Sequence, residues 1–272
     1  MIKQIPDRRK PWTGILAGLL RVAPPYVWKT WVLMLMATGT LACSHTRKGP
    51  PRVLVFSKTA AFYHESIPAG NRALMKLGAE NGFDVDTTTN AEWFNRDTLQ
   101  HYSAVVFLST TGDVLNGQQE AAFEQYLKAG GGYVGIHAAS DCEYDWEWYG
   151  KLAGAYFKNH PHPQPATLHV VNTQHPATEG LPVTFDYDDE WYNFSNMNPD
   201  VNVLMTIDET TYRGGQHGDF HPMAWYHEYG GGRAFFSALG HSEAAFSDPL
   251  HLKHFLGGIR YAIGENRELN YQ

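Results

Sequence analysis

The sequence has only two cysteines, Cys43 and Cys142, among 272 residues. Two thiols exclude both a disulfide framework and a zinc site with four thiolate ligands. Charged residues are also few, at 18% of the chain, whereas 43% of the residues are hydrophobic. This balance excludes an intrinsically disordered chain and is sufficient for one sizeable hydrophobic core or two small ones.

Positive charge is scarce outside the N-terminal segment. The first 42 residues include six basic residues and one acidic residue, and the remaining 230 include 15 basic and 27 acidic residues. A body with a net charge of −12 is a poor partner for the phosphate backbone of nucleic acids. We therefore expect no nucleic-acid partner.

The N-terminal segment has the order of features that is typical of an export signal. Residues 1–30 are basic, and a short run of apolar and small residues extends from Val32 to Ala42. This order predicts a signal peptide over residues 1–42, and the run is too short for a stable membrane span. Residues 43–51 are polar and contain Pro and Gly, which predicts a tether.

Cys43 directly follows the expected cleavage position and resembles the lipidated cysteine of a bacterial lipobox. We therefore expect lipidation of Cys43 and residence at the cell envelope or in the periplasm, with the membrane contacted only through the lipid. Thr40 stands where a lipobox prefers Leu. A plain signal peptide and a misassigned start thus remain alternative interpretations.

From Arg52 onward, patterns typical of buried strands alternate with patterns typical of helices. Continuous apolar runs and alternation predict strands at 52–56, 83–86, 104–108, 133–136, 167–171, 201–207, 223–226 and 234–238. Helical periodicity and glycine stops predict helices at 67–81, 118–129 and 249–263. The alternation favours an α/β fold with right-handed βαβ units and a mostly parallel central sheet. We expect one domain over 52–264 and a C-terminal tail over 265–272.

The most specific local motif is GGGYVGIHAAS, from Gly130 to Ser140. A buried strand runs here into small residues that allow a tight turn, so His137 lies at the carboxyl end of the strand. Open α/β sheets bind ligands at that edge. The geometry is that of a nucleophile elbow with histidine in place of serine or cysteine. The alternative is a histidine that ends the strand for structural reasons.

Six further motifs accompany the elbow, and together they resemble the ThuA-like (trehalose utilisation) family from Arg52 to about Gly264. They are KTAAFYHESI with His64, FKNHP with His160, QHPAT with His175, DEWYNF with Glu190, GDFHPMAW with His221, and ALGHSE with His241. The resemblance implies a class I glutamine amidotransferase-like, flavodoxin-like three-layer sandwich. It also implies a link to the utilisation of disaccharides, including 3-keto-sugars.

The resemblance to amidotransferases does not extend to their chemistry. Those enzymes use an elbow cysteine and a His-x-Glu pair, and His241-Ser-Glu243 preserves the spacing of the pair. His137, however, replaces the elbow cysteine, and an imidazole cannot form the thioester that glutamine hydrolysis requires. We therefore expect no glutaminase activity. Cys142, five residues beyond the elbow, is no substitute.

The clustered imidazoles and carboxylates favour either general acid–base catalysis or a metal site. We expect His137, His241, His64 and Glu190 to be catalytic. The same four residues would be the ligands of a divalent metal ion, zinc first. The sequence has no HExxH motif, so it does not choose between these alternatives. The candidates for substrate binding are His160, His221, Trp225, Trp191, Tyr192, Asp141 and Glu243.

The remaining histidines of the body have structural interpretations. His162 and His175 precede prolines and are interpreted as turn residues. A larger group is interpreted as surface or helix positions: His101, His169, His227, His251 and His254.

Aromatic residues provide the indication of a substrate. Residues 143–149 interleave acidic side chains with rings, and Trp191 and Tyr192 follow Glu190. Rings beside carboxylates suit the C–H faces and hydroxyls of a sugar, although such rings also commonly cover the edge of a core. We expect a sugar-processing protein that acts on a glycoside, disaccharide or 3-keto-sugar. The alternative is a carbohydrate-binding lipoprotein without catalysis.

Overall fold

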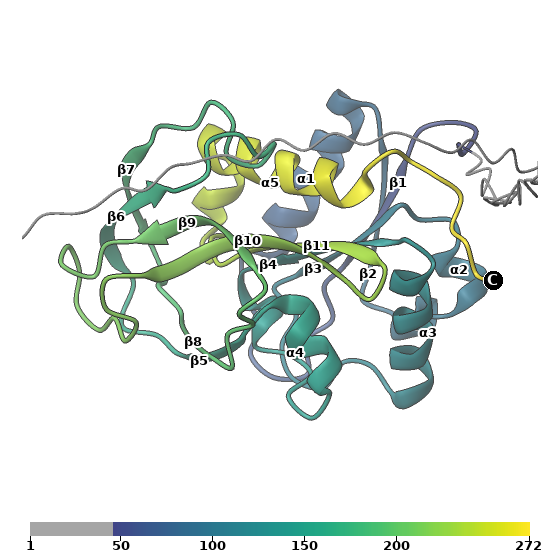
Figure 1. The fold of residues 1–272 in the computed structure, drawn as a ribbon, viewed down its shortest axis with the longest axis horizontal. Coiled ribbons are helices and arrows are strands. Elements are labelled where there is room, and N and C mark those ends of the chain that lie inside the picture. Colours follow the sequence, from purple (N-terminus) through teal and green to yellow (C-terminus); the bar gives the residue numbers. More distant parts are fainter. Residues whose placement is uncertain (1–45) are drawn as a thin grey trace, which may run out of the picture. The chain divides into compact units, whose positions relative to one another are not determined.

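Nine strands form the central sheet in the computed structural model, which describes residues 46–272 (Figure 1). In spatial order they are β2 (Asp84–Thr88), β1 (Arg52–Phe56), β3 (Ala104–Leu108), β4 (Gly132–Ile136), β11 (Gly232–Ser237), β10 (His221–Tyr229), β9 (Asn202–Ile207), β6 (Gln164–Val170) and β7 (Thr184–Asp189). The predictions for the signal peptide and for Cys43 lie outside the described residues. Among residues 46–272, no helix is both long enough and apolar enough to cross a membrane.

The sheet has two halves with different hydrogen-bond patterns. Strands β2, β1, β3, β4 and β11 are parallel, and every residue of β3 and β4 is buried. Strands β10, β9, β6 and β7 continue the sheet as antiparallel neighbours. Burial on both faces explains why β1, β3 and β4 have nearly continuous apolar sequences, whereas the edge strand β2 does not.

Helices cover both faces of the parallel half. Figure 1 shows α1 (Ile67–Asn81) and α5 (Pro249–Ile263) on one face, and α3 (Gly117–Lys128) and α4 (Glu147–Ala153) on the other. A four-residue helix, α2 (Arg96–Leu99), precedes β3. The arrangement confirms the predicted three-layer α/β fold. The glycine stop is also confirmed, because α1 ends at Gly82 with a left-handed φ of 79°.

Several short or polar elements have no counterpart among the predicted ones. Strand β7 has the sequence TFDYDD, in which acidic residues mask the alternation, and α4 has only seven residues. Strands β5 (Tyr156–Asn159) and β8 (Asn193–Ser195) form a separate two-stranded sheet. Elements of this length carry too few residues for a periodic pattern to emerge.

The segments expected to flank the domain pack against it. Thr46 forms an isolated bridge with Arg267, and the backbone N–H of Arg47 donates to the carbonyl of Asn266. The Arg47 guanidinium also donates to the Gln100 carbonyl at 2.7 Å. The end of the expected tether and the beginning of the C-terminal tail are therefore part of the folded unit.

Candidate active site at the carboxyl edge of the sheet

The four side chains predicted to be catalytic converge on one point. His64 lies in the loop after β1, His137 follows β4, Glu190 follows β7, and His241 follows β11. One nitrogen or oxygen atom of each lies within 4.8 Å of the corresponding atoms of the others. Their loops meet because the carboxyl ends of β1, β4 and β11 lie at the same edge of the sheet.

His137 has the strained backbone of an elbow. Its φ is 53°, a left-handed conformation that a residue with a Cβ adopts at a cost of about 1 kcal/mol. The ring is completely buried, and its Nδ1 lies 2.8 Å from the carbonyl oxygen of Ala238. A carbonyl can only accept, so Nδ1 donates its proton there. The lone pair of Nε2 therefore faces the other three residues.

The space around Nε2 of His137 holds more acceptors than donors. Nε2 lies 3.2 Å from Nε2 of His64, 3.0 Å from the Tyr192 hydroxyl and 3.5 Å from Oε2 of Glu190. Nδ1 of His64 is buried and has no hydrogen-bond partner among the described residues. If Nε2 of His64 donates to His137, the lone pair on Nδ1 of His64 has no donor. In the other tautomer the Nδ1 proton is unmatched and two lone pairs face each other.

Burial and mutual charge set the protonation of the cluster. Burial, together with the nearby His137 and His241, lowers the pKa of His64 to about 3, so its ring is neutral at physiological pH. Burial alone would raise the pKa of Glu190, but contacts with His137 and His241 outweigh it and hold that pKa well below its usual range. The close contact with Glu190 raises the pKa of His241. The site thus combines a carboxylate with at least one neutral imidazole.

Asp189 is a site residue that the sequence patterns do not single out. Its side chain is 2% exposed and accepts three backbone N–H groups, from Glu190 (3.0 Å), Gly240 (3.0 Å) and His241 (3.2 Å). It therefore fixes the segment of Glu190 against the loop of His241. Its position directly before Glu190 is the signal that could have revealed it.

Three of the expected substrate-binding residues lie beside the cluster. His160, with a side chain that is 39% exposed, places Nδ1 3.1 Å from Oε1 of Glu190. Tyr192 is buried and contacts the ring of His137, with 4.5 Å between ring centroids. Asp141 is half-buried and accepts a 2.6 Å hydrogen bond from the Tyr144 hydroxyl.

Of the other four residues expected to bind substrate, three are buried and one is exposed, so substrate binding by them stays a prediction. Trp191, Trp225 and His221 are completely buried, and both indole N–H groups donate to backbone carbonyls, of Gln164 and Ala153 respectively. Both tryptophan rings belong to the hydrophobic core. Glu243 is exposed, and the carboxylate that contacts His241 is Glu190, whose Oε2 lies 3.3 Å from Nδ1.

Of the histidines interpreted as surface or helix positions, His251 and His254 do lie on a helix, but they and His227 are buried. His227 lies on β10, and His251 and His254 lie on the core side of α5. Aromatic rings pack beside all three imidazoles. Cys142 is also completely buried, and burial raises the pKa of its thiol. A buried, protonated thiol is not a nucleophile, in agreement with the expectation that Cys142 does not replace the elbow cysteine.

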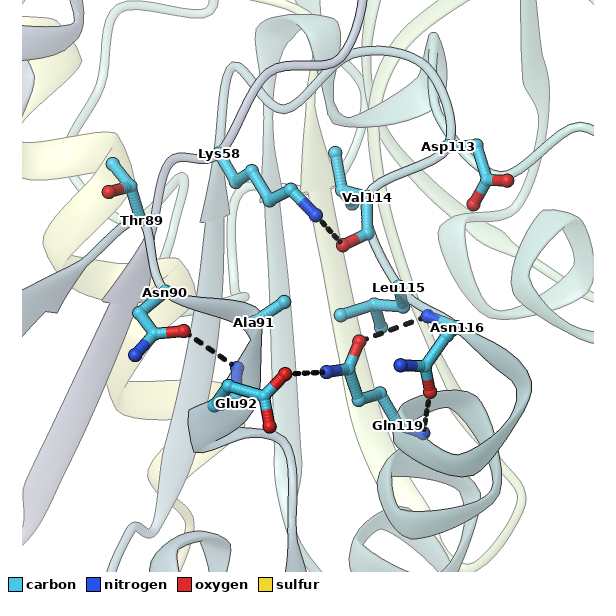
Figure 2. A pocket seen from close by; sticks show the side chains of 10 residues that line it. All are labelled: Lys58, Thr89, Asn90, Ala91, Glu92, Asp113, Val114, Leu115, Asn116 and Gln119. Carbon is cyan, nitrogen blue, oxygen red and sulfur yellow. Dashed lines mark hydrogen bonds between the residues drawn. The ribbon is translucent and has the colours of Figure 1, made fainter.

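A separate hollow of about 370 Å³ lies beyond the ends of β1, β2 and β3, and none of the four clustered residues lines it (Figure 2). Several of its polar side chains are already paired. The Lys58 ammonium donates to the Val114 carbonyl at 2.6 Å, and the Gln119 amide donates to Glu92 at 3.2 Å. The histidine cluster, with its unmatched polar atoms, is therefore the stronger candidate for chemistry.

Comparison with known proteins agrees with this geometry. The family model for ThuA, described as trehalose utilisation, matches residues 52–262. The chain belongs to the ThuA family. No curated protein matches the chain.

Two solved structures described as ThuA-like resemble the chain. The protein from Bacteroides uniformis is 25% identical, with a TM-score of 0.69, and the match covers 84% of this chain and 98% of that one. The protein from Parabacteroides merdae is 20% identical, with a TM-score of 0.64 and coverage of 78% and 90%. A β-galactosidase from Bacillus circulans sp. alkalophilus matches with a TM-score of 0.52 at 11% identity, over 81% of this chain and 31% of that one. The last likeness concerns the fold alone.

Proposed function

We propose that this ThuA-family protein processes a glycoside, disaccharide or 3-keto-sugar at a divalent metal site formed by His64, His137, His241 and Glu190. The observation that carries the proposal is the convergence of three imidazoles and one carboxylate within 4.8 Å, in which the buried Nδ1 atoms of His64 and His241 have no hydrogen-bond partner among the described residues. The ThuA family description, trehalose utilisation, supports the substrate class.

The residues fit a metal ion better than a closed hydrogen-bond network. Nδ1 of His137 donates to a backbone carbonyl, which is the arrangement that orients a metal-binding imidazole and exposes its other nitrogen. Nδ1 of His241 lies 3.3 Å from Oε2 of Glu190, but its orientation does not make a hydrogen bond. Three nitrogens and a carboxylate oxygen are ligands that zinc accepts. We therefore place zinc first.

The chain's own groups suit the chemistry of a sugar hydroxyl or carbonyl. A bound zinc ion would polarise a carbonyl oxygen or lower the pKa of a water molecule. The Glu190 carboxylate and the Tyr192 hydroxyl lie 3.5 and 3.0 Å from Nε2 of His137. The Tyr192 hydroxyl can donate a hydrogen bond to the reacting oxygen, and the Glu190 carboxylate can accept one from a substrate hydroxyl. His160 contacts Glu190 at 3.1 Å from the solvent side, where a substrate would enter.

Turnover assays separate a catalyst from a binding protein. The mature protein would be incubated with trehalose, other disaccharides and their 3-keto forms, before and after removal of metal with EDTA and reloading with zinc. We expect a product that disappears with the metal and returns with zinc. Sugar binding without any product would favour the alternative, a carbohydrate-binding lipoprotein. Turnover that survives complete removal of metal would contradict the metal part of the proposal.

We further propose that the protein is exported and anchored by a lipid on Cys43. The basic lead, the apolar run and the following cysteine support this proposal. A disaccharide-processing site at the cell envelope would meet its substrate before uptake.

A further inference from the structure

Three loops next to the cluster are joined by backbone hydrogen bonds into one rim. We define the loop rim as residues 59–62, 109–112 and 141–144. The backbone N–H of Ala60 donates to the Thr111 carbonyl at 2.7 Å, and that of Gly112 donates to the Asp141 carbonyl at 2.9 Å. Gly112 has a φ of 74°, and a Cβ there would lie 3.1 Å from the backbone nitrogen of Ala61. Glycine thus allows the close approach that makes the rim rigid.

The loop rim carries two aromatic rings that are not buried. Phe62 is 63% exposed and Tyr144 is 48% exposed. The Phe62 carbonyl accepts from the Thr111 hydroxyl at 2.7 Å, so its backbone is held in place. Tyr144 stacks on Tyr156, with 5.1 Å between centroids. Exposed rings on an anchored backbone are available to contact a ligand at a low cost in conformational entropy.

Both rings belong to the surroundings of the cluster. The ring of Phe62 meets that of His64 edge to face, with 4.8 Å between centroids. The Tyr144 hydroxyl donates to Asp141 at 2.6 Å and to the Phe157 carbonyl at 3.1 Å. The rim therefore places an exposed apolar ring next to a metal-ligand candidate, and a carboxylate acceptor on another loop of the rim.

We propose that the loop rim is a binding subsite for an uncharged pyranose ring, with the face of Phe62 stacked on the sugar and Asp141 accepting from its hydroxyls. This inference rests on the proposed function, because it assigns the position of the sugar beside the same cluster. A flat ring matches the C–H face of a pyranose, and a carboxylate matches its hydroxyls. The Asp141 carboxylate would repel a phosphate placed against it, so the subsite favours a neutral sugar ring over a phosphorylated one.

Calorimetric titration of the zinc-loaded mature protein with trehalose and with trehalose 6-phosphate tests the subsite. Phe62→Ala should weaken trehalose binding about tenfold, as expected for the loss of one aromatic contact and its buried area. Phe62→Trp should bind within about threefold of wild type, since it keeps a ring face. Met75→Ala removes another exposed apolar side chain, on α1, and should change nothing. Trehalose 6-phosphate should bind more weakly than trehalose to the wild type.

Zinc content, measured on the same samples, separates this inference from the proposed function. Phe62→Ala should retain the zinc of the wild type, because Phe62 is not a ligand. Unchanged trehalose affinity in Phe62→Ala would overturn the subsite and leave the metal site standing. Loss of zinc in Phe62→Ala would also overturn it, because the ring would then support the cluster instead of the sugar. A zinc-loaded wild type that does not bind trehalose would overturn both the subsite and the proposed substrate class.

Discussion

Asp189 has no free surface for a ligand, yet it fixes two of the four residues of the cluster through their backbones. Both of its oxygens act only as acceptors of N–H groups, at 3.0 to 3.2 Å. Such a residue affects the site through position and not through contact with a substrate. The completely buried His254 affects the stability of the fold instead, because its burial lowers its pKa.

Asp189→Asn should lower zinc affinity about 10- to 100-fold, the usual effect of losing a group that orients metal ligands. The asparagine NH₂ cannot accept, so at least one of the three backbone N–H groups loses its partner. Competition of the protein with a zinc chelator measures the affinity. Glu243→Gln is the matched control, because Glu243 is an exposed carboxylate of the same loop region. Equal zinc affinity in Asp189→Asn and wild type would contradict the positioning role.

His254 should make the folded state less stable in acid. Burial lowers the pKa of His254 to about 4, whereas the pKa in the unfolded chain is about 6.5. The unfolded state therefore binds a proton first, and stability is lost as the pH falls from about 6.5 to about 4, by up to about 3 kcal/mol. Urea unfolding at several pH values measures the loss. The loss should be smaller in His254→Gln, and an identical pH dependence would contradict this origin. Burial also lowers the pKa of His175 to about 4. His254→Gln should therefore still lose some stability in acid, because His175 is unchanged.

At the scale of elements, strands buried on both faces and helices that end at glycine are predictable from sequence. The helix expected at 67–81 has those bounds in the structure, as do the strands expected at 52–56 and 104–108. Strand β7 was not predictable, because its acidic residues alternate with only half-buried rings. The burial of Trp191 and Trp225 was not predictable for a related reason: an aromatic residue near a site motif has the same sequence signature whether its ring faces a ligand or the core.

Gly82→Ala should destabilise the fold by about 1 kcal/mol. Gly82 ends α1 with a φ of 79°, and no atom lies within 4 Å of a Cβ added there, so the cost comes from backbone conformation alone. Gly117→Ala is the control, since Gly117 also has free space but has no positive φ and lies in the first turn of α3. Chemical denaturation should show equal or greater stability for Gly117→Ala. Equal losses in both variants would contradict the conformational explanation.

At the scale of the whole molecule, the fold and the family could be inferred from the order of the motifs, whereas the exact contacts could not. His64 and His241 are 177 positions apart in sequence, and only the shared edge of the sheet explains why their rings lie 5.6 Å apart. The His-x-Glu spacing relates Glu243 to His241, but the carboxylate that contacts His241 is Glu190, which the DEWYNF motif had singled out as catalytic. Contacts of this kind depend on how a long connection returns to the sheet, which no local pattern encodes.

Cellular location is also a property of the whole chain. Cys43→Ala should move the protein from the membrane fraction to the soluble fraction, because the lipid on Cys43 is the expected anchor. Fractionation and intact-mass measurement of the wild type and the variant provide the test, with Cys142→Ala as a control at the buried thiol. An unprocessed wild-type product that carries Met1 and remains in the cytoplasm would contradict export.

The central claim is that His64, His137, His241 and Glu190 bind one metal ion as a unit. Elemental analysis of protein purified without a His-tag and reloaded with zinc tests it most directly, in the wild type, His137→Asn, His241→Asn and the double variant. Asparagine tolerates the left-handed backbone of position 137, so the variants should fold, which thermal unfolding verifies. We predict about one equivalent of zinc in the wild type and less than about a tenth in each single variant, with no further loss in the double variant. A wild type with less than about a tenth of an equivalent, or a folded His241→Asn protein that retains full zinc, would contradict the claim.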